Sequence, residues 1–236
     1  VSLRDGIQDV MLDKLGPAVP HLQNPDRVTS ARVAADEHNA QLLLLDDGFQ
    51  HRRLSRDLDI VLIDALNPFG YGHLLPRGLL RDPLSGLKRA DVIVLTRADQ
   101  CSDEIRQQTI DRISAIRGND EHVEIAFTAD RLVNSAGETT DFESIRGEKI
   151  AAFCGIGNPE GFARTIADCG LRIADSLQNF PDHHHYTAED LTAIGKQADE
   201  KNVAAILTTR KDLVKIKQTE FAGRPLWAVQ IEVNIV

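Results

Sequence analysis

Two adjacent carboxylates, Asp46 and Asp47, directly follow a short apolar run and are the residues best placed to do chemistry. The run, Leu42 to Leu45, is bounded by polar residues, which is typical of a central parallel strand covered on both faces. The carboxyl end of such a strand opens into the ligand crevice of an α/β sheet. Mg²⁺ prefers one or two carboxylates, with water and substrate phosphate as its other ligands. The pattern therefore predicts a Mg²⁺ site, with an ordinary Asp-Asp-Gly turn as the alternative.

A second candidate for chemistry is the run of three histidines that follows Asp182. It begins at His183, and it places an imidazole beside a carboxylate that could orient the ring. Imidazole is the side chain best suited to moving protons near neutral pH. A solvated loop is one alternative interpretation, and a metal site is another.

Three further loops carry side chains that could meet phosphate or a nucleotide. Arg77 lies between Pro76 and Gly78, and Arg81 follows in the same loop, from which guanidinium groups could pair with phosphate. Gln50 and His51 lie one turn beyond the paired carboxylates and could reach phosphate or substrate. Asp99 ends a Thr-Arg-Ala-Asp stretch that is similar to the base-recognition loop of nucleotide-binding P-loop proteins. Ordinary turns and solvated loops are the alternative for each of them.

These residues need a scaffold, and the hydrophobic pattern indicates one. Short apolar strands alternate with helical patterns, which predicts a parallel sheet with right-handed crossovers. Ser102 is suited to cap the second helix, and Lys211 and Lys215 at helical spacing predict a helix surface. The predicted strands are 42–45, 59–64, 91–96, 122–133, 149–154, 203–207 and 226–229, and the predicted helices are 28–38 and 102–116.

Composition favours a soluble cytoplasmic α/β protein. The 236 residues carry 27 Lys and Arg against 36 Asp and Glu, a net charge of -9 that argues against nucleic acid as a partner. The three cysteines are widely spaced, so we expect reduced thiols rather than a disulfide framework or a zinc site. No apolar run approaches the roughly 20 residues that span a bilayer, and no signal peptide is visible.

Several motifs together resemble the tetraacyldisaccharide 4'-kinase family of lipid A biosynthesis. Their order and spacing agree with the family from about Pro20 to near the C-terminus. The motifs are DDGFQHRRL from Asp46, RDLDIVLID from Arg56, GHLLPRGLLR from Gly72, AFCGIGNP from Ala152, FPDHH from Phe180 and TTRKDLVK from Thr208.

The resemblance implies a fold, a reaction and roles for the candidate residues. The fold would be a P-loop-kinase-like core over residues 1–120, a β-strand linker or hinge over 121–147, and a smaller α/β domain over 148–236. The reaction would transfer the γ-phosphoryl group of ATP to the 4'-hydroxyl of a tetraacyl glucosamine disaccharide. Mg²⁺ would be held by Asp46 and Asp47, and His183 would act as the base on the sugar hydroxyl. Gln50, His51 and Asp99 would then serve the nucleotide, and Arg77 and Arg81 the substrate.

The family also implies a location and a partner. The acceptor carries acyl chains, so the enzyme would act as a peripheral protein at the cytoplasmic face of the bacterial inner membrane. Membrane contact would come through an N-terminal segment that these residues lack. The chain by itself would be soluble.

Two departures from the family pattern change what we expect of this chain. No G-x-x-x-x-G-K-[ST] loop, whose amides and Lys hold nucleotide phosphates, occurs in the sequence. The family also has a Gly-Asp-Glu motif, whose Asp acts together with the base. In this chain the motif falls on Gly6-Ile7-Gln8, so its acidic residues are absent. Asp5 and Asp9 lie nearby but out of register. The chain therefore reads as the downstream portion or a remnant of such a kinase, and by itself it should bind ATP poorly.

Two other functions stay open. A catalytically inactive binding protein would keep the acceptor half of the site without ATP turnover. A receiver-like phosphoacceptor domain would use Asp64 together with the paired carboxylates. The short interval between Asp47 and the next predicted strand, close to the minimum for a parallel crossover, argues against the receiver.

Overall fold

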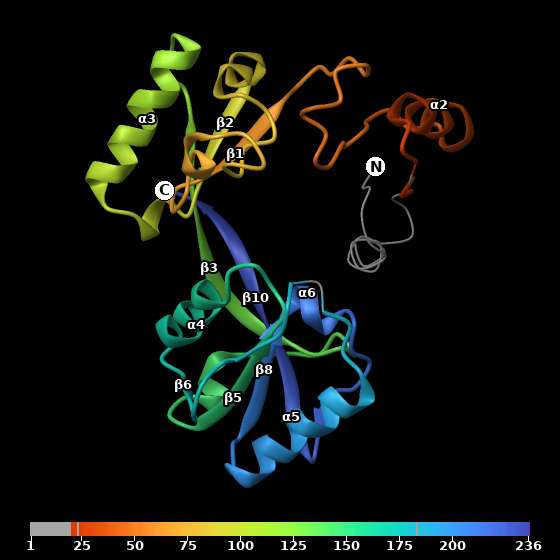
Figure 1. The fold of residues 1–236 in the computed structure, drawn as a ribbon. Coiled ribbons are helices and arrows are strands. Elements are labelled where there is room, and N and C mark those ends of the chain that lie inside the picture. Colours follow the sequence, from red (N-terminus) through yellow and green to blue (C-terminus); the bar gives the residue numbers. More distant parts are fainter. Residues whose placement is uncertain (1–19, 23, 183) are drawn as a thin grey trace. The chain divides into compact units, whose positions relative to one another are not determined.

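The computed structural model describes residues 20–22, 24–182 and 184–236, which form two compact units (Figure 1). Among these residues, the first unit holds those up to Phe127 together with Val233–Val236, and the second holds Thr128–Glu232. The division lies inside the long strand β3 (Val123–Val133), and strand β10 (Arg224–Ile235) also contributes residues to both units. It falls within the segment 121–147 that the sequence assigns to a hinge.

The first unit is built on parallel strands. Strand β2 (Val92–Thr96) pairs with β1 (Ile60–Asp64) on one side and with the beginning of β3 on the other. Helix α3 (Asp103–Arg117) packs its buried Ile113 into the apolar cluster formed by these strands. As predicted, Ser102 caps this helix, because its hydroxyl accepts the Ile105 N–H at 3.4 Å.

Helix α2 (Arg27–His38) also lies where the sequence predicts a helix. It begins because the Asp26 carboxylate accepts the Val28 N–H, and it ends at Asn39, whose φ of 50° is left-handed. Short 3₁₀ turns connect the remaining elements of this unit: η1 (Gly70–Gly72), η2 (Leu84–Arg89) and η3 (Ala98–Gln100).

The predicted strand at 42–45 is wrong, because this segment is not a strand in the structure. Leu42 and Leu44 are 78% and 74% exposed. An apolar run forms a buried strand only where other layers cover it, and the described residues leave this one open. The paired carboxylates therefore follow an extended loop rather than the end of a central strand.

The second unit is a mostly parallel sheet with the order β10, β8 (Ala205–Thr209), β5 (Lys149–Cys154) and β6 (Arg172–Ile173). Alternate residues of β5 face opposite sides, as a strand requires. Ile150, Ala152 and Cys154 pack with α4 (Pro159–Asp168), whereas Phe153 packs with α5 (Ala188–Glu200). Figure 1 shows both helices beside this sheet.

Smaller elements complete the second unit. They are β4 (Thr139–Thr140), η4 (Phe142–Ile145), β7 (Gln178–Asn179), α6 (Arg210–Leu213) and β9 (Glu220–Phe221). The predicted α/β class is confirmed, and the strands predicted at 59–64, 91–96, 122–133 and 149–154 match β1, β2, β3 and β5 closely. Across the described part of the chain, no helix has both the length and the apolar character needed to cross a membrane.

Candidate functional site

The paired carboxylates lie on an exposed turn of the first unit. Asp47 takes a left-handed backbone conformation with a φ of 50°, which Asp tolerates better than most residues. Gly48 fits beside it, because a Cβ at that position would lie 2.4 Å from the Leu45 side chain, which would have to shift. Both Asp46 and Asp47 are exposed, and one carboxylate oxygen of Asp47 accepts from Arg81.

Two contacts fix this turn to the rest of the unit. Phe49 packs against the apolar cluster of the unit, and the Arg89 guanidinium lies 4.4 Å from the centre of its ring. Arg56 donates to the backbone oxygen of His51 at 2.7 Å and forms a bidentate ion pair with Asp59 at 2.6 and 3.0 Å. The turn is therefore held by packing on one side and by a fixed guanidinium on the other.

The structure brings together two candidate residues that lie 34 positions apart. Arg81 Nη1 lies 2.6 Å from Asp47 Oδ2, so a residue predicted to bind substrate pairs with a residue predicted to bind Mg²⁺. Arg77, four residues earlier, is exposed. Gly78 lies in a close turn between them, where a Cβ would approach the His73 carbonyl oxygen to 2.2 Å.

The carboxyl ends of β1 and β2 carry a different pair. Asp64 ends β1, and both of its oxygens accept from Arg97, through Nε at 2.9 Å and through Nη2. Arg97 adopts a left-handed φ of 58° to make this contact, and Asp99 is exposed in the turn that follows. Because its carboxylate is engaged on both oxygens, Asp64 is poorly suited to accept a phosphoryl group, which argues further against the receiver interpretation.

In the second unit, Asp182 accepts from Lys211 Nζ at 3.1 Å. His183, the predicted base, lies outside the described residues, as do Asp5 and Asp9. The residues on either side of His183 are described, and Asp182 and His184 each contact a residue elsewhere in the second unit.

Aromatic contacts fix the segment beyond His183. The His184 ring stacks on Phe180 with 4.7 Å between ring centres, and its Nε2 lies 2.9 Å from Asp190 Oδ2. Asp190 also completes the capping box of α5 with Thr187. The backbone N–H of Thr187, followed by the hydrogen bond from His184, lowers the pKa of Asp190 below its ordinary value. Tyr186 packs against Phe180 and Phe153 with centre distances of 5.1 and 5.3 Å.

Beneath this segment lies a fully buried carboxylate that the sequence did not single out. Asp212 Oδ2 accepts from the Gly155 N–H at 3.0 Å and from the Thr209 hydroxyl at 2.7 Å, and Lys215 Nζ lies 3.1 Å from Oδ1. Asp212 is 0% exposed and the Lys215 side chain 6% exposed, so the helix surface predicted for Lys215 is wrong. Burial is possible here because each charge neutralises the other.

The buried carboxylate affects two neighbouring groups. Burial and then the Asp212 charge raise the pKa of Tyr186 above its ordinary value. The same two causes raise the pKa of Cys154 to about 11. A Cβ at position 155 would lie 3.1 to 3.3 Å from atoms of Pro181, Tyr186 and Asp212, which is a tight fit, so glycine suits this close packing.

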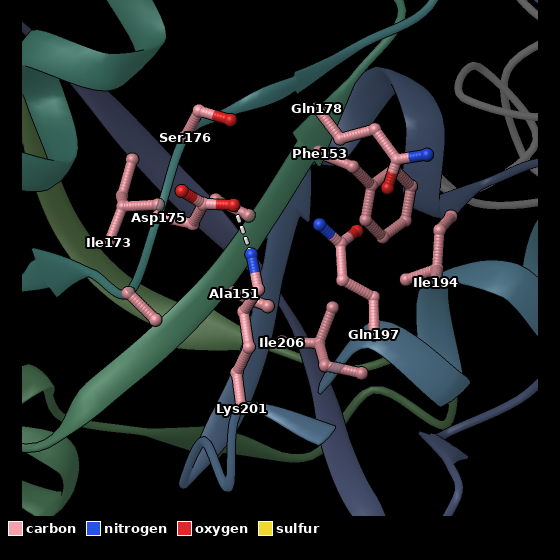
Figure 2. A pocket seen from close by; sticks show the side chains of 12 residues that line it. Ala151, Phe153, Ile173, Asp175, Ser176, Gln178, Ile194, Gln197, Lys201 and Ile206 are labelled. Atoms are coloured by element: carbon pink, nitrogen blue, oxygen red, sulfur yellow. Dashed lines mark hydrogen bonds and ion pairs between the residues drawn. The ribbon is translucent and has the colours of Figure 1, made fainter. Parts of the chain in front are cut away.

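Two hollows among the described residues differ in volume. One, in the second unit, lies between β5, the segment 173–178 and α5, and Asp175 and Lys201 pair across it (Figure 2). Its cavity volume is about 20 Å³, room for about one water. Another, in the first unit, has about 290 Å³ and is lined partly by His51.

Within the described ranges, no group of three or more His, Cys, Asp or Glu side chains is arranged to hold a metal ion. A Mg²⁺ ion that takes the rest of its ligands from phosphate and water needs only the two oxygens that Asp46 and Asp47 offer. The three cysteines are free thiols, and Cys154 is buried.

Both units are mostly parallel α/β structures, and the loops of the first display the paired carboxylates and Arg81. The family model described as LpxK: Tetraacyldisaccharide-1-P 4'-kinase matches residues 6–236. The chain belongs to this family.

Individual relatives agree with this assignment. The tetraacyldisaccharide 4'-kinase of Halothermothrix orenii is 38% identical over 225 residues, which cover 91% of this chain and 58% of the relative. The same enzyme from Anaeromyxobacter dehalogenans strain 2CP-1 is 39% identical over 219 residues, 92% of this chain and 57% of the relative. A crystal structure of the "apo" form of LpxK from Aquifex aeolicus in complex with ATP has a TM-score of 0.69 and 26% identity, and the match covers 98% of this chain and 65% of that one. The chain thus spans less than two thirds of the length of these relatives.

Proposed function

We propose that this chain forms part of a kinase that transfers the γ-phosphoryl group of ATP to the 4'-hydroxyl of a tetraacyl glucosamine disaccharide. The family match over residues 6–236 carries this proposal. Support comes from the two segments expected to hold the chemistry, since the turn at Asp46 and Asp47 is exposed and the segment around His183 is anchored on both sides.

Asp46 and Asp47 would hold Mg²⁺, because both residues are exposed and a hard cation prefers carboxylate oxygens. A bound Mg²⁺ would neutralise charge on the phosphate oxygens. Arg81, already paired with Asp47, places a guanidinium at the same turn, where it would pair with a substrate phosphate. Arg77, Gln50, His51 and Asp99 would contribute to substrate or nucleotide binding from the neighbouring loops.

His183 would take the proton of the acceptor hydroxyl. The described residues on either side of it are held, because Asp182 pairs with Lys211 and His184 is stacked on Phe180. A base must lie within hydrogen-bond reach of the proton it abstracts, so a fixed segment favours transfer. Asp182 would orient the imidazole.

ATP binding requires a phosphate-binding loop, and none occurs in these 236 residues. The nucleotide phosphates would therefore be held by a further portion of the kinase, outside these residues. The same portion would supply peripheral contact with the cytoplasmic face of the inner membrane, where an acylated acceptor is found. Without such a portion, the chain would be a binding protein that keeps the acceptor half of the site.

A reconstruction tests the proposal. The chain is joined to the portion of the Halothermothrix orenii relative that lies outside the match, and this completed protein is mixed with Mg²⁺, γ-labelled ATP and tetraacyldisaccharide 1-phosphate in detergent micelles. We expect label in the 4'-phosphate of the lipid with the completed protein and none with the chain alone. A folded completed protein that binds the lipid but transfers no label, beside an active intact relative, would favour the binding protein.

A further inference from the structure

One ion pair joins the segment that carries the predicted base to the helix that follows strand β8. Lys211 Nζ lies 3.1 Å from Asp182 Oδ1, although 29 positions separate the two residues in sequence. Lys211 belongs to α6, which begins directly after β8, and Asp182 directly precedes His183. The ion pair therefore acts on the residue beside the proposed base.

The backbone that carries Lys211 is fixed by the two residues that follow it. Asp212 is fully buried, and its carboxylate accepts from the Gly155 N–H and from the Thr209 hydroxyl. Leu213 is 1% exposed and lies in the apolar cluster that α5 also joins. Because both side chains are locked into the interior, the Lys211 ammonium can move only by rotations of its own side chain.

The residues around Asp182 are attached to the neighbouring strand. The Phe180 N–H donates to the oxygen of Cys154, the last residue of β5, at 2.8 Å. The His184 N–H donates to the Pro181 oxygen at 3.1 Å, which closes a turn over Asp182. Since β5 and β8 pair directly, both ends of the ion pair are held by one sheet, and little further ordering is needed to form it.

The ion pair affects the geometry of Asp182 more than the stability of the unit. The Lys211 side chain is 33% exposed and that of Asp182 45%, and ion pairs at such positions add little to the free energy of unfolding. An ammonium on one oxygen nevertheless restricts rotation of the carboxylate. A carboxylate that orients an imidazole fixes the tautomer and the direction of the ring, which it can do only when it is itself held.

We propose that Lys211 is a positioning residue for acceptor activation. It holds Asp182 Oδ1, and the fixed carboxylate then orients the imidazole of His183. In this role Lys211 touches neither ATP nor the acceptor, and the proton passes only from the acceptor hydroxyl to the imidazole. The identity of the base rests on the proposed function, whereas the role of Lys211 rests on the ion pair and its buried support.

The first test uses the chain itself and needs no turnover. The imidazole ¹⁵N signals are recorded at about pH 8, where an ordinary imidazole is neutral and its two tautomers give different shifts. The His183 signals are those that His183→Ala removes. We expect Lys211→Met to redistribute the two tautomers of His183 in the same direction as Asp182→Ala.

The matched control for this test is Lys196→Met. Lys196 is another lysine of the second unit, with a side chain that is 77% exposed and paired with Glu200. Its replacement should leave the His183 signals unchanged. Unchanged His183 signals in Lys211→Met as well would overturn the proposal.

The second test measures kcat and KM in the completed protein. Lys211→Met should lower kcat at least about tenfold, because positioning acts on the proton transfer, and it should leave the KM of ATP and of the lipid unchanged. If the effect passes through Asp182, the double variant with Asp182→Ala should be no slower than Asp182→Ala alone. Urea unfolding of each variant establishes that folded proteins are compared.

Two kinetic results would contradict the role of Lys211. A raised KM at unchanged kcat would assign Lys211 to substrate binding, and losses that multiply in the double variant would show that it acts without Asp182. A completed protein that is inactive without any substitution would refute the proposed function alone. The tautomer measurement on the chain would then still decide whether Lys211 positions the imidazole.

Discussion

Arg81 donates to the Asp47 carboxylate at 2.6 Å, although 34 residues separate the two in sequence. This ion pair joins the loop that was assigned to substrate phosphate with the turn that was assigned to Mg²⁺. Phosphoryl transfer needs positive charge around the transferred group from more than one direction. A metal ion at the turn and a guanidinium beside it would satisfy that need.

Arg81→Ala should therefore reduce catalysis far more than stability. In the completed protein we expect phosphoryl transfer to fall at least about tenfold, as expected for loss of a charge-assisted contact. Both side chains are about half exposed, so the free energy of unfolding should change by less than about 1 kcal/mol. Arg52→Ala, which removes another exposed guanidinium paired with Asp82, is the control and should leave transfer intact. Equal losses in the two variants would contradict a specific role for Arg81.

Asp46→Asn and Asp47→Asn should each lower transfer by at least about 100-fold, because a catalytic metal supplies several kcal/mol of charge stabilisation. Asn is a well-matched replacement at 47, since it tolerates the left-handed backbone there. Asp57→Asn, on the exposed loop that follows, is the matched control. Rates are measured across a Mg²⁺ titration, and full activity of Asp47→Asn at ordinary Mg²⁺ concentrations would refute the metal assignment.

Asp212→Asn should destabilise the second unit strongly. It leaves the Lys215 ammonium buried without its counter-ion, a loss of about 3–5 kcal/mol. Asp182→Asn removes a more exposed ion pair, with Lys211, and should cost less than about 1 kcal/mol. Urea unfolding of the two variants measures the difference. Similar midpoints would show that the buried pair does not stabilise this unit.

The Cys154 thiol should resist alkylation at pH 8, because a pKa of about 11 leaves on the order of 0.1% of it as thiolate. Since the pKa is raised, reactivity must increase as the pH rises toward that value. The check is the rate of iodoacetamide labelling in a variant with Cys101→Ser and Cys169→Ser, over a pH range where circular dichroism shows the fold intact. A rate that levels off below pH 9 would be inconsistent with the buried thiol.

Local patterns were sufficient for most of the fold. Apolar runs predicted β1, β2 and β5, and the Ser102 cap predicted the start of α3, because these signals depend on neighbours in sequence. The run at 42–45 failed because burial depends on what other segments cover, and none of the described ones covers it.

The candidate site was predictable only in part. Sequence motifs singled out Asp47 and Arg81 separately, but not their contact, which depends on how two distant loops fold. The helix surface predicted from Lys211 and Lys215 includes the position of Asp212 between them, whereas Asp212 is buried in contact with Gly155 and Lys215. Gly155 directly follows the predicted strand 149–154. A glycine at such a position is the sequence signal that could have indicated close packing there.

The most direct test of the central claim compares two neighbouring histidines in the completed protein. The initial rate of 4'-phosphorylation is measured for His183→Ala and for His185→Ala, which removes an exposed imidazole two residues away. We predict a loss of about 10²–10⁴-fold for His183→Ala, as expected for a general base, and little change for His185→Ala. Equal rates for both variants would contradict a catalytic role for this segment and, with it, the assignment of the second unit to acceptor activation.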